Sequence, residues 1–174
     1  MFKMPKDIYS NFLKSYNINY SPIILIAPAK LIQSLQNSQK KMSKSDPNNM
    51  SRVELLDTPE SIKEKIYNAL SDNIGFISFD PKTRPSVSSL VQIYSSCSDI
   101  SIDQVVENYK GRSLDEFKSD LVQVLVKKIE PIQKRYYELK SNPSYVEQIL
   151  KEGSQKANIL AKAKLDRVMN VMGL

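Results

Sequence analysis

The sequence predicts a mainly α-helical protein, with a short α/β portion at its start followed by an α-helical bundle. Three observations predict this fold class. Residues 23–27 form a continuous apolar, β-branched run, which is typical of a strand buried on both faces in a parallel sheet. Residues 36–52 show no periodicity, which predicts a long loop. After residue 57, apolar residues recur at helical spacing. We therefore expect two domains, 1–57 and 58–174.

The first portion contains a helix and two short strands before the loop. Residues 5–16 predict a helix whose apolar face consists of Ile8, Tyr9, Phe12, Leu13 and Tyr16. Pro28 ends the strand at 23–27, and residues 31–35 predict a second short strand. The loop then runs to residue 52 with Met42 and Met50 as its apolar residues.

Helix-start signals are clear in the second portion. Thr58-Pro59-Glu60 supplies an N-cap, a proline at the first helical position and an acid in the first turn. A helix follows at 86–96. Capping boxes, in which a Ser or Thr is followed three residues later by Glu or Gln, predict further starts at Ser101 and Ser113. Asn142-Pro143 begins the last helix.

Two long apolar stripes run along the last two helices, and we expect both to face a core. The stripe that begins behind Ser113 is interrupted by Pro131, which predicts a kink. Its members are Leu114, Phe117, Leu121, Leu125, Ile129, Ile132, Tyr136 and Leu139. The stripe of the last helix is Tyr145, Ile149, Ala157, Leu160, Leu165 and Met169.

Composition excludes several kinds of chemistry. The chain has 174 residues, a single cysteine and no histidine. An internal disulfide framework, a multi-cysteine metal site, histidine-ligated metals and Ser-His-Asp triads are therefore absent, and we expect no protein-held metal. Cys97 is expected to be a small buried side chain. No apolar run reaches transmembrane length, which predicts a soluble globular protein with no membrane partner.

The net charge of +6 is unevenly distributed. Residues 1–57 carry eight Lys/Arg against four Asp/Glu, residues 58–109 carry four against seven, and residues 110–174 carry thirteen against eight. The two basic regions suit a polyanion such as nucleic acid, and they equally suit a solvated surface.

The segment KKMSKSDPNN at residues 40–49 concentrates ammonium groups and hydroxyls and then makes a turn. Lysine is a mobile point charge with three donors, and serine hydroxyls and loop amides add further donors. Such a loop suits a polyphosphate whose charge moves during a reaction. The alternative from composition alone is a disordered basic linker. The Gly-x-x-x-x-Gly-Lys pattern of a P-loop is absent.

Within this segment, residues 41–45 read KMSKS and match the second signature loop of class I aminoacyl-tRNA synthetases in all five positions. The flanks resemble tryptophanyl-tRNA synthetases of the bacterial and mitochondrial branch, at residues 30–38 before the loop and in parts of 71–90 and 153–157 after it. The resemblance extends from about Asp7 to the last helix. Tyrosyl relatives carry a different central pair in the loop, so Met42-Ser43 favours tryptophan.

The resemblance implies an ATP-dependent tryptophan–tRNA ligase, which makes tryptophanyl-adenylate with release of pyrophosphate and then charges tRNA(Trp). By matching positions, Lys41 and Lys44 would contact the triphosphate as the catalytic residues, and Ser43 and Ser45 would assist. The backbones of Met42 and Ile32 would approach adenine. Mg²⁺ would accompany ATP, and the family is homodimeric. Residues 1–57 would be the C-terminal end of a Rossmann-type catalytic domain, and residues 58–174 a helical anticodon-binding-type domain.

Five basic residues are candidates for contact with the tRNA backbone: Lys127, Lys128, Lys134, Arg135 and Lys140. The alternative for each of them is a solvated surface charge.

Parts of the family pattern are missing. The other ATP signature contains histidines and lies, like the tryptophan pocket, in the first half of the catalytic domain. We therefore expect a C-terminal half, from a truncated gene model, a splice form or a pseudogene, which is inactive alone. The alternatives are a non-catalytic helical module that binds tRNA or pairs with a synthetase subunit, and a helical protein with an incidental KMSKS. Residues 46–80 resemble the mitochondrial form, so the expected compartment is the mitochondrial matrix, or the cytoplasm if the protein is bacterial.

Overall fold

The computed structural model describes residues 10–11, 14–15 and 31–174. The chain divides into two compact units, one of which contains residues 31–138 and the other residues 139–174. Residues 10, 11, 14 and 15 are helical, as expected for a helix at 5–16. The rest of that helix and the strand expected at 23–27 lie outside the described residues.

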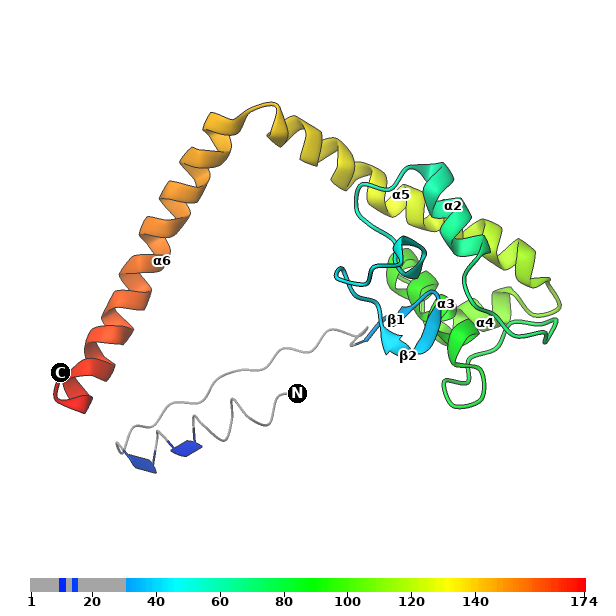
Figure 1. Cartoon of the computed structure of the whole chain (residues 1–174), viewed down its shortest axis with the longest axis horizontal. Coiled ribbons are helices and arrows are strands. Elements are labelled where there is room, and N and C mark those ends of the chain that lie inside the picture. Colours follow the sequence, from blue (N-terminus) through cyan, green and yellow to red (C-terminus); the bar gives the residue numbers. More distant parts are fainter. Residues whose placement is uncertain (1–9, 12–13, 16–30) are drawn as a thin grey trace. The chain divides into compact units, whose positions relative to one another are not determined.

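The described elements confirm a mainly helical chain with a short strand-containing portion (Figure 1). In order, they are β1 (Gln33–Ser34), β2 (Asn37–Lys41), the short 3-10 helix η1 (Asn49–Ser51), α2 (Pro59–Tyr67), α3 (Pro85–Ser98), α4 (Ile102–Asn108), α5 (Leu114–Lys140) and α6 (Pro143–Met172). No helix in this part of the chain is long and apolar enough to cross a bilayer. The domain boundary at residue 57 stays a prediction.

The strands form an antiparallel hairpin, in which Gln33 pairs with Lys41 and Ser34 with Asn37 across an irregular register. The expectation of an unbroken loop over 36–52 is therefore wrong for residues 37–41. Strand β2 has the sequence NSQKK and only partly buried or exposed residues. Such a strand lacks the apolar alternation that sequence patterns detect, because it is stabilised by main-chain pairing with β1.

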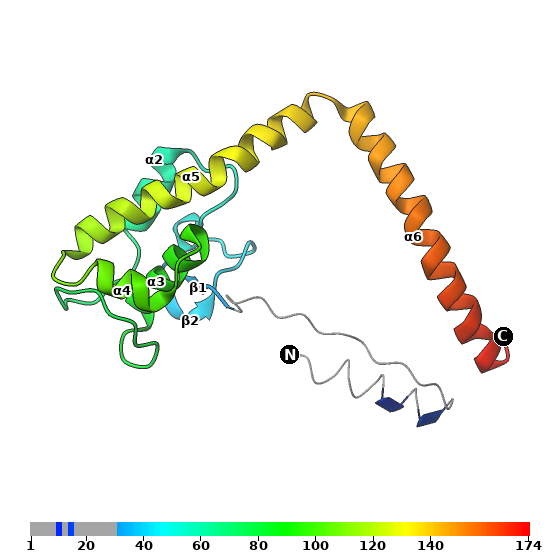
Figure 2. The ribbon, with the colours of Figure 1, turned by 180° about the vertical axis from the view of Figure 1, so that it is seen from behind.

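The hairpin turn is fixed to the end of α2. Leu70 N donates to Leu35 O at 2.8 Å, and Gln36 Nε2 donates to Asn68 O at 2.8 Å. Leu35 itself is buried in the same core as the helices. Figure 1 and the view from behind in Figure 2 show the hairpin beside α3 and show α2 next to α5. The strand portion and the helices of residues 31–138 therefore share one core.

That core is formed by the apolar faces of α2 to α5. Its fully buried apolar members are Ile62, Ile66, Val87, Leu90, Val91, Val105, Phe117 and Leu121. The rings of Tyr94, Tyr109 and Phe117 pack together with centroids 5.0–5.7 Å apart: Tyr94 stacks on Phe117, and Tyr109 meets both edge to face. The Tyr109 hydroxyl donates to Asp120 Oδ2 at 2.7 Å, which gives this buried phenol a partner. Burial raises the pKa of Tyr109, and its hydrogen bonds with Tyr94 and Asp120 raise it further.

The expected helix starts are confirmed. Thr58 Oγ1 accepts from Ser61 N, and Ser101 Oγ accepts from Gln104 N. At α5 the capping box is complete, since Ser113 Oγ accepts from Glu116 N and a Glu116 carboxylate oxygen accepts from Ser113 N at 2.8 Å. Asn142 Oδ1 accepts from Tyr145 N at the start of α6.

The apolar stripe of α5 is buried only in part. Its members up to Ile129 pack in the core, whereas Ile132 is 47% and Tyr136 40% exposed. Helix α5 continues through Pro131 to Lys140. In α6, no residue is buried among the described residues, and the stripe expected to face a core is exposed there. Helical periodicity identifies an apolar face, but it does not identify what covers that face.

Candidate functional site

The candidate loop begins at the last residue of the hairpin. Lys41 is the final residue of β2 and lies opposite Gln33. The next residue, Met42, donates its amide hydrogen to Ile32 O at 2.8 Å. The structure therefore brings Ile32 and Met42 together, although Ile32 lies ten positions before Met42 in the sequence. Met42 also packs against the core, which ties the loop to the body of residues 31–138.

Residues 43–46 form a turn that presents polar groups to solvent. Asp46 N donates to Ser43 O at 3.3 Å, and the hydroxyl oxygens of Ser43 and Ser45 lie 3.1 Å apart. Lys41, Lys44 and Ser45 are exposed. The two ammonium groups are therefore available to an incoming anion, at the turn and at the strand end before it.

The turn expected at Asp46-Pro47-Asn48-Asn49 is built from side chains that accept from the backbone. Asp46 Oδ1 accepts from Asn48 N at 2.9 Å. Asn48 Oδ1 then accepts from Met50 N at 2.9 Å and caps η1. Short polar residues compete for backbone donors in this way in turns. The sequence predicted this turn correctly.

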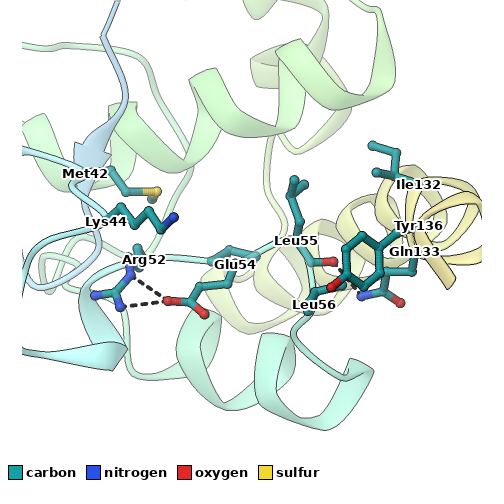
Figure 3. A pocket seen from close by; sticks show the side chains of 10 residues that line it. Met42, Lys44, Arg52, Glu54, Leu55, Leu56, Ile132, Gln133 and Tyr136 are labelled. Atoms are coloured by element: carbon teal, nitrogen blue, oxygen red, sulfur yellow. Dashed lines mark hydrogen bonds and ion pairs between the residues drawn. The ribbon is translucent and has the colours of Figure 1, made fainter. Parts of the chain in front are cut away.

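A cavity of about 540 Å³ lies beside the loop. Met42 and Lys44 are on one side, and Ile132, Gln133 and Tyr136 of α5 are on the other (Figure 3). The remaining lining residues are Arg52, Val53, Glu54, Leu55 and Leu56. The cavity is of ligand size, and its lining is mainly apolar with charged groups on the loop side.

The segment after the loop is anchored to two helices. Gln133 Nε2 of α5 donates to Leu55 O at 2.9 Å and to Asp57 O at 2.8 Å. The Asp57 carboxylate forms a largely buried ion pair with Lys65 of α2 and accepts from Glu54 N. These contacts fix the C-terminal base of the loop.

Sequence reasoning missed most of the residues that line this cavity, among them Arg52, Gln133 and Tyr136. Arg52 lies within the span taken as loop, and Gln133 and Tyr136 lie on the helix behind it. The polar Gln133 next to the apolar stripe of α5 was a weak signal, because a buried amide requires a hydrogen-bond partner. Its partners are more than 70 residues away in sequence, so the pattern alone could not identify them.

The five basic candidates for a nucleic-acid face are all exposed on α5. Lys128 pairs with Asp99 at 3.1 Å, and Arg135 pairs with Glu138 at 3.1 Å. Exposed pairs of this kind contribute little to stability, and they are readily exchanged for other anions.

Comparison with known proteins identifies the family of this chain. Residues 4–130 match the family described as tRNA synthetases class I (W and Y). The tryptophan–tRNA ligase of Bacillus subtilis is 38% identical over 178 residues, which is 99% of this chain and 54% of the relative. The Bacillus anthracis ligase is 43% identical, with the same shares covered. The chain thus spans about half the length of the curated relatives that it matches.

Solved structures give the same fold. The tryptophanyl-tRNA synthetase of Mycoplasma pneumoniae matches with a TM-score of 0.84 at 23% identity, over 97% of this chain and 51% of that protein. A C-terminal half of a synthetase of this kind accounts for both the loop and the helices. The chain therefore belongs to the class I tRNA synthetases of the tryptophan and tyrosine group.

Proposed function

We propose that this chain supplies the ATP-phosphate loop and the tRNA-binding helices of a tryptophan–tRNA ligase. The observation that supports this proposal is the hairpin, which ends at Lys41 directly before the KMSKS turn and bonds the Met42 amide to Ile32 O. The identity of 38–43% to bacterial tryptophan–tRNA ligases supports tryptophan as the amino acid.

In the proposed reaction, a carboxylate oxygen of tryptophan attacks the α-phosphorus of ATP. The bond from that phosphorus to the bridging oxygen breaks, and the negative charge moves to the departing pyrophosphate. Lys41 and Lys44 stabilise this charge most strongly when it is largest, which lowers the barrier. Ser43 and Ser45 add hydroxyl donors. Met42 N is already bonded to Ile32 O, so a contact from Met42 to adenine would use its carbonyl.

Magnesium, in this proposal, arrives on the phosphates of ATP. Asp46 is the carboxylate within the KMSKS turn, and its Oδ1 is already engaged by the Asn48 amide. A protein-held magnesium site usually takes one or two carboxylates together with phosphates and water. The loop residues fit the phosphates of a Mg–ATP complex better than they fit the ion itself.

The partners and compartment are proposed with the activity. The five exposed basic residues of α5 would contact the tRNA(Trp) backbone, and the assembled enzyme would be a homodimer. The mitochondrial matrix stays the predicted compartment, with bacterial cytoplasm as the alternative. The relatives named above are bacterial.

The test is tryptophan-dependent ATP–pyrophosphate exchange, first with this chain alone and then with the half of the Bacillus subtilis ligase that this chain does not match, added in trans. We expect no exchange from the folded chain alone, because the chain has no histidine and spans about half of its relatives. We expect exchange when the halves are combined, and a loss of roughly 100-fold or more in the Lys41→Ala/Lys44→Ala variant.

The matched control is Lys63→Ala/Lys82→Ala, which removes two exposed lysines outside the loop. Exchange by the chain alone would refute the need for the other half. Exchange that survives loss of both loop lysines would refute the role of the loop. Salt-sensitive tRNA binding without exchange in either format would favour the non-catalytic module.

A further inference from the structure

Arg52 lies at the centre of the turn through which the chain leaves the KMSKS loop. Its side chain is 11% exposed. Nη1 donates to Asp46 O at 2.7 Å and more weakly to Asn48 O at 3.5 Å. Nη2 donates to Asn49 Oδ1 at 3.2 Å. One guanidinium therefore binds three successive parts of the turn.

Glu54 contacts the same guanidinium on its other edge and so orients it. Nε of Arg52 donates to Glu54 Oε1 at 2.8 Å, and Nη2 lies 2.7 Å from the same oxygen. All three nitrogens are thus used, in the planar fork geometry that arginine offers and lysine does not. Figure 3 shows this pair between Lys44 and the Leu55 segment.

The contacts of Arg52 join the turn to a segment that is anchored to two helices. On one side is the turn after Lys44, whose internal bonds are those of short Asx side chains. On the other side is the segment that Gln133 and Lys65 hold to α5 and α2. Without Arg52, the carbonyl of Asp46 loses its charged donor, and the turn keeps its local bonds together with the hydrogen bond from Leu35 N to Ser51 O at its end.

We infer that Arg52 is a positioning residue, which holds the exit turn of the loop so that Lys44 meets the phosphates in one place. Its own charge is directed into the turn and towards Glu54. The inference rests on the proposed function, since it concerns the phosphate loop of that activity. It predicts that the planar fork is required, because a lysine at this position keeps the charge but cannot make the same set of contacts.

The first measurement is hydrogen–deuterium exchange of the full chain, read from peptides that cover residues 41–51. In Arg52→Ala we expect exchange of the Asn48 and Met50 amides to rise about tenfold, as expected for loss of a hydrogen bond to a charged group. Peptides of α3 to α5 should be unchanged. Arg112→Ala is the control, because it removes an exposed arginine that lies over the Tyr109 ring.

The second measurement follows the protection that pyrophosphate gives to residues 41–45. We expect Arg52→Ala to need about tenfold more pyrophosphate for the same protection, and Arg52→Lys to behave like Arg52→Ala. Lys44→Ala serves as the reference for loss of a direct contact.

Three outcomes overturn the inference. The first is unchanged exchange over 41–51 in Arg52→Ala, and the second is increased exchange throughout α3 to α5, which would mark a general folding role. The third is full rescue by Arg52→Lys, which would show that charge alone suffices. If pyrophosphate fails to protect even the wild-type loop, the proposed phosphate role fails. The exchange comparison without ligand still decides whether Arg52 holds the turn.

Discussion

At the residue scale, Arg84 shows how a single buried cation organises an irregular loop. It is 6% exposed and forms a bidentate ion pair with Asp72, at 2.8 and 2.6 Å. It also donates to Phe76 O at 2.9 Å and to Ser78 Oγ at 2.6 Å. The hydrogen bonds from Arg84 are the largest cause of the lowered pKa of Asp72, against which burial acts in the opposite direction.

We predict that Asp72→Asn lowers the stability of the chain at neutral pH by about 1.5–3 kcal/mol, because the buried guanidinium loses its charged acceptor. The pKa of Asp72 in the folded chain lies below its ordinary value of 3.8. Its stabilising contribution is therefore complete above that pH, and is lost as the pH falls through the folded-state pKa. Urea unfolding of both proteins between about pH 7 and pH 2.5 measures the free energy of unfolding as a function of pH.

In Asp72→Asn, the free energy of unfolding should fall less steeply with decreasing pH than in wild type. Some of the fall should remain, because Asp80 and Glu116 also have lowered pKa values. Asp166→Asn, which changes an exposed carboxylate of α6, is the control. An acid decline of unchanged steepness in Asp72→Asn would contradict the argument.

Lys118 provides a second prediction at this scale. It is 4% exposed, and its ammonium donates to Tyr67 O and Ala69 O at 3.0 Å each, which caps the end of α2. Burial lowers the pKa of this lysine. Lys118→Met keeps the bulk but leaves two carbonyls without their donor, so we expect a loss of about 1–3 kcal/mol in urea unfolding.

The control for Lys118 is Lys127→Met on the exposed side of the same helix, which should stay within about 0.5 kcal/mol of wild type. If Lys118→Met were as stable as wild type, the contacts to α2 would be energetically unimportant.

At the scale of elements, the helices were predictable because their start signals are local. The oxygens of Thr58, Ser101, Ser113 and Asn142 cap amides three residues ahead, so the sequence window contains the whole interaction. Strand β2 was not predictable in the same way. Its five polar residues form a strand because they pair with β1. Neither their composition nor an alternation of polar and apolar residues indicates that pairing.

The same distinction between local and distant partners applies to the candidate site. The KMSKS residues and the Asp46 turn are contiguous, and the sequence located them. Gln133 binds backbone carbonyl groups, and Arg52 does so at Asp46 and Asn48. Any residue carries such a carbonyl, so the sequence holds no mark of these partners. Likewise, Ile132 and Tyr136 continue a helical stripe beyond the core and line the cavity instead. Spacing fixes a face of a helix, and tertiary structure fixes its neighbour.

At the scale of the whole molecule, the charge distribution separates two kinds of surface. Residues 58–109 carry four basic and seven acidic side chains, whereas residues 110–174 carry thirteen and eight. A polyanion is therefore attracted to the later helices and repelled by the earlier ones. For the proposed tRNA partner, this asymmetry directs the first test to residues 110–174, where Lys127 and Lys134 of α5 are exposed.

We predict that tRNA binding by this chain weakens steeply with salt, because each lysine or arginine that neutralises a phosphate releases a counterion. With about three such contacts, affinity should fall roughly 30- to 50-fold between about 50 and 200 mM salt. Filter binding or fluorescence anisotropy with labelled tRNA measures the slope. Lys127→Ala/Lys134→Ala should reduce that slope by about one to two and weaken binding at low salt.

The comparison variant is Lys82→Ala, an exposed lysine in the acidic region, which should leave both affinity and slope unchanged. A wild-type slope near zero would mean that phosphates are not the contact. An equal loss from Lys82→Ala and from the α5 variant would mean that net charge alone attracts the tRNA. A loss confined to α5 would instead place the tRNA phosphates along α5. Gln133 of this helix anchors the segment that follows the KMSKS loop. The proposed tRNA surface and the proposed ATP loop would then be connected through one helix.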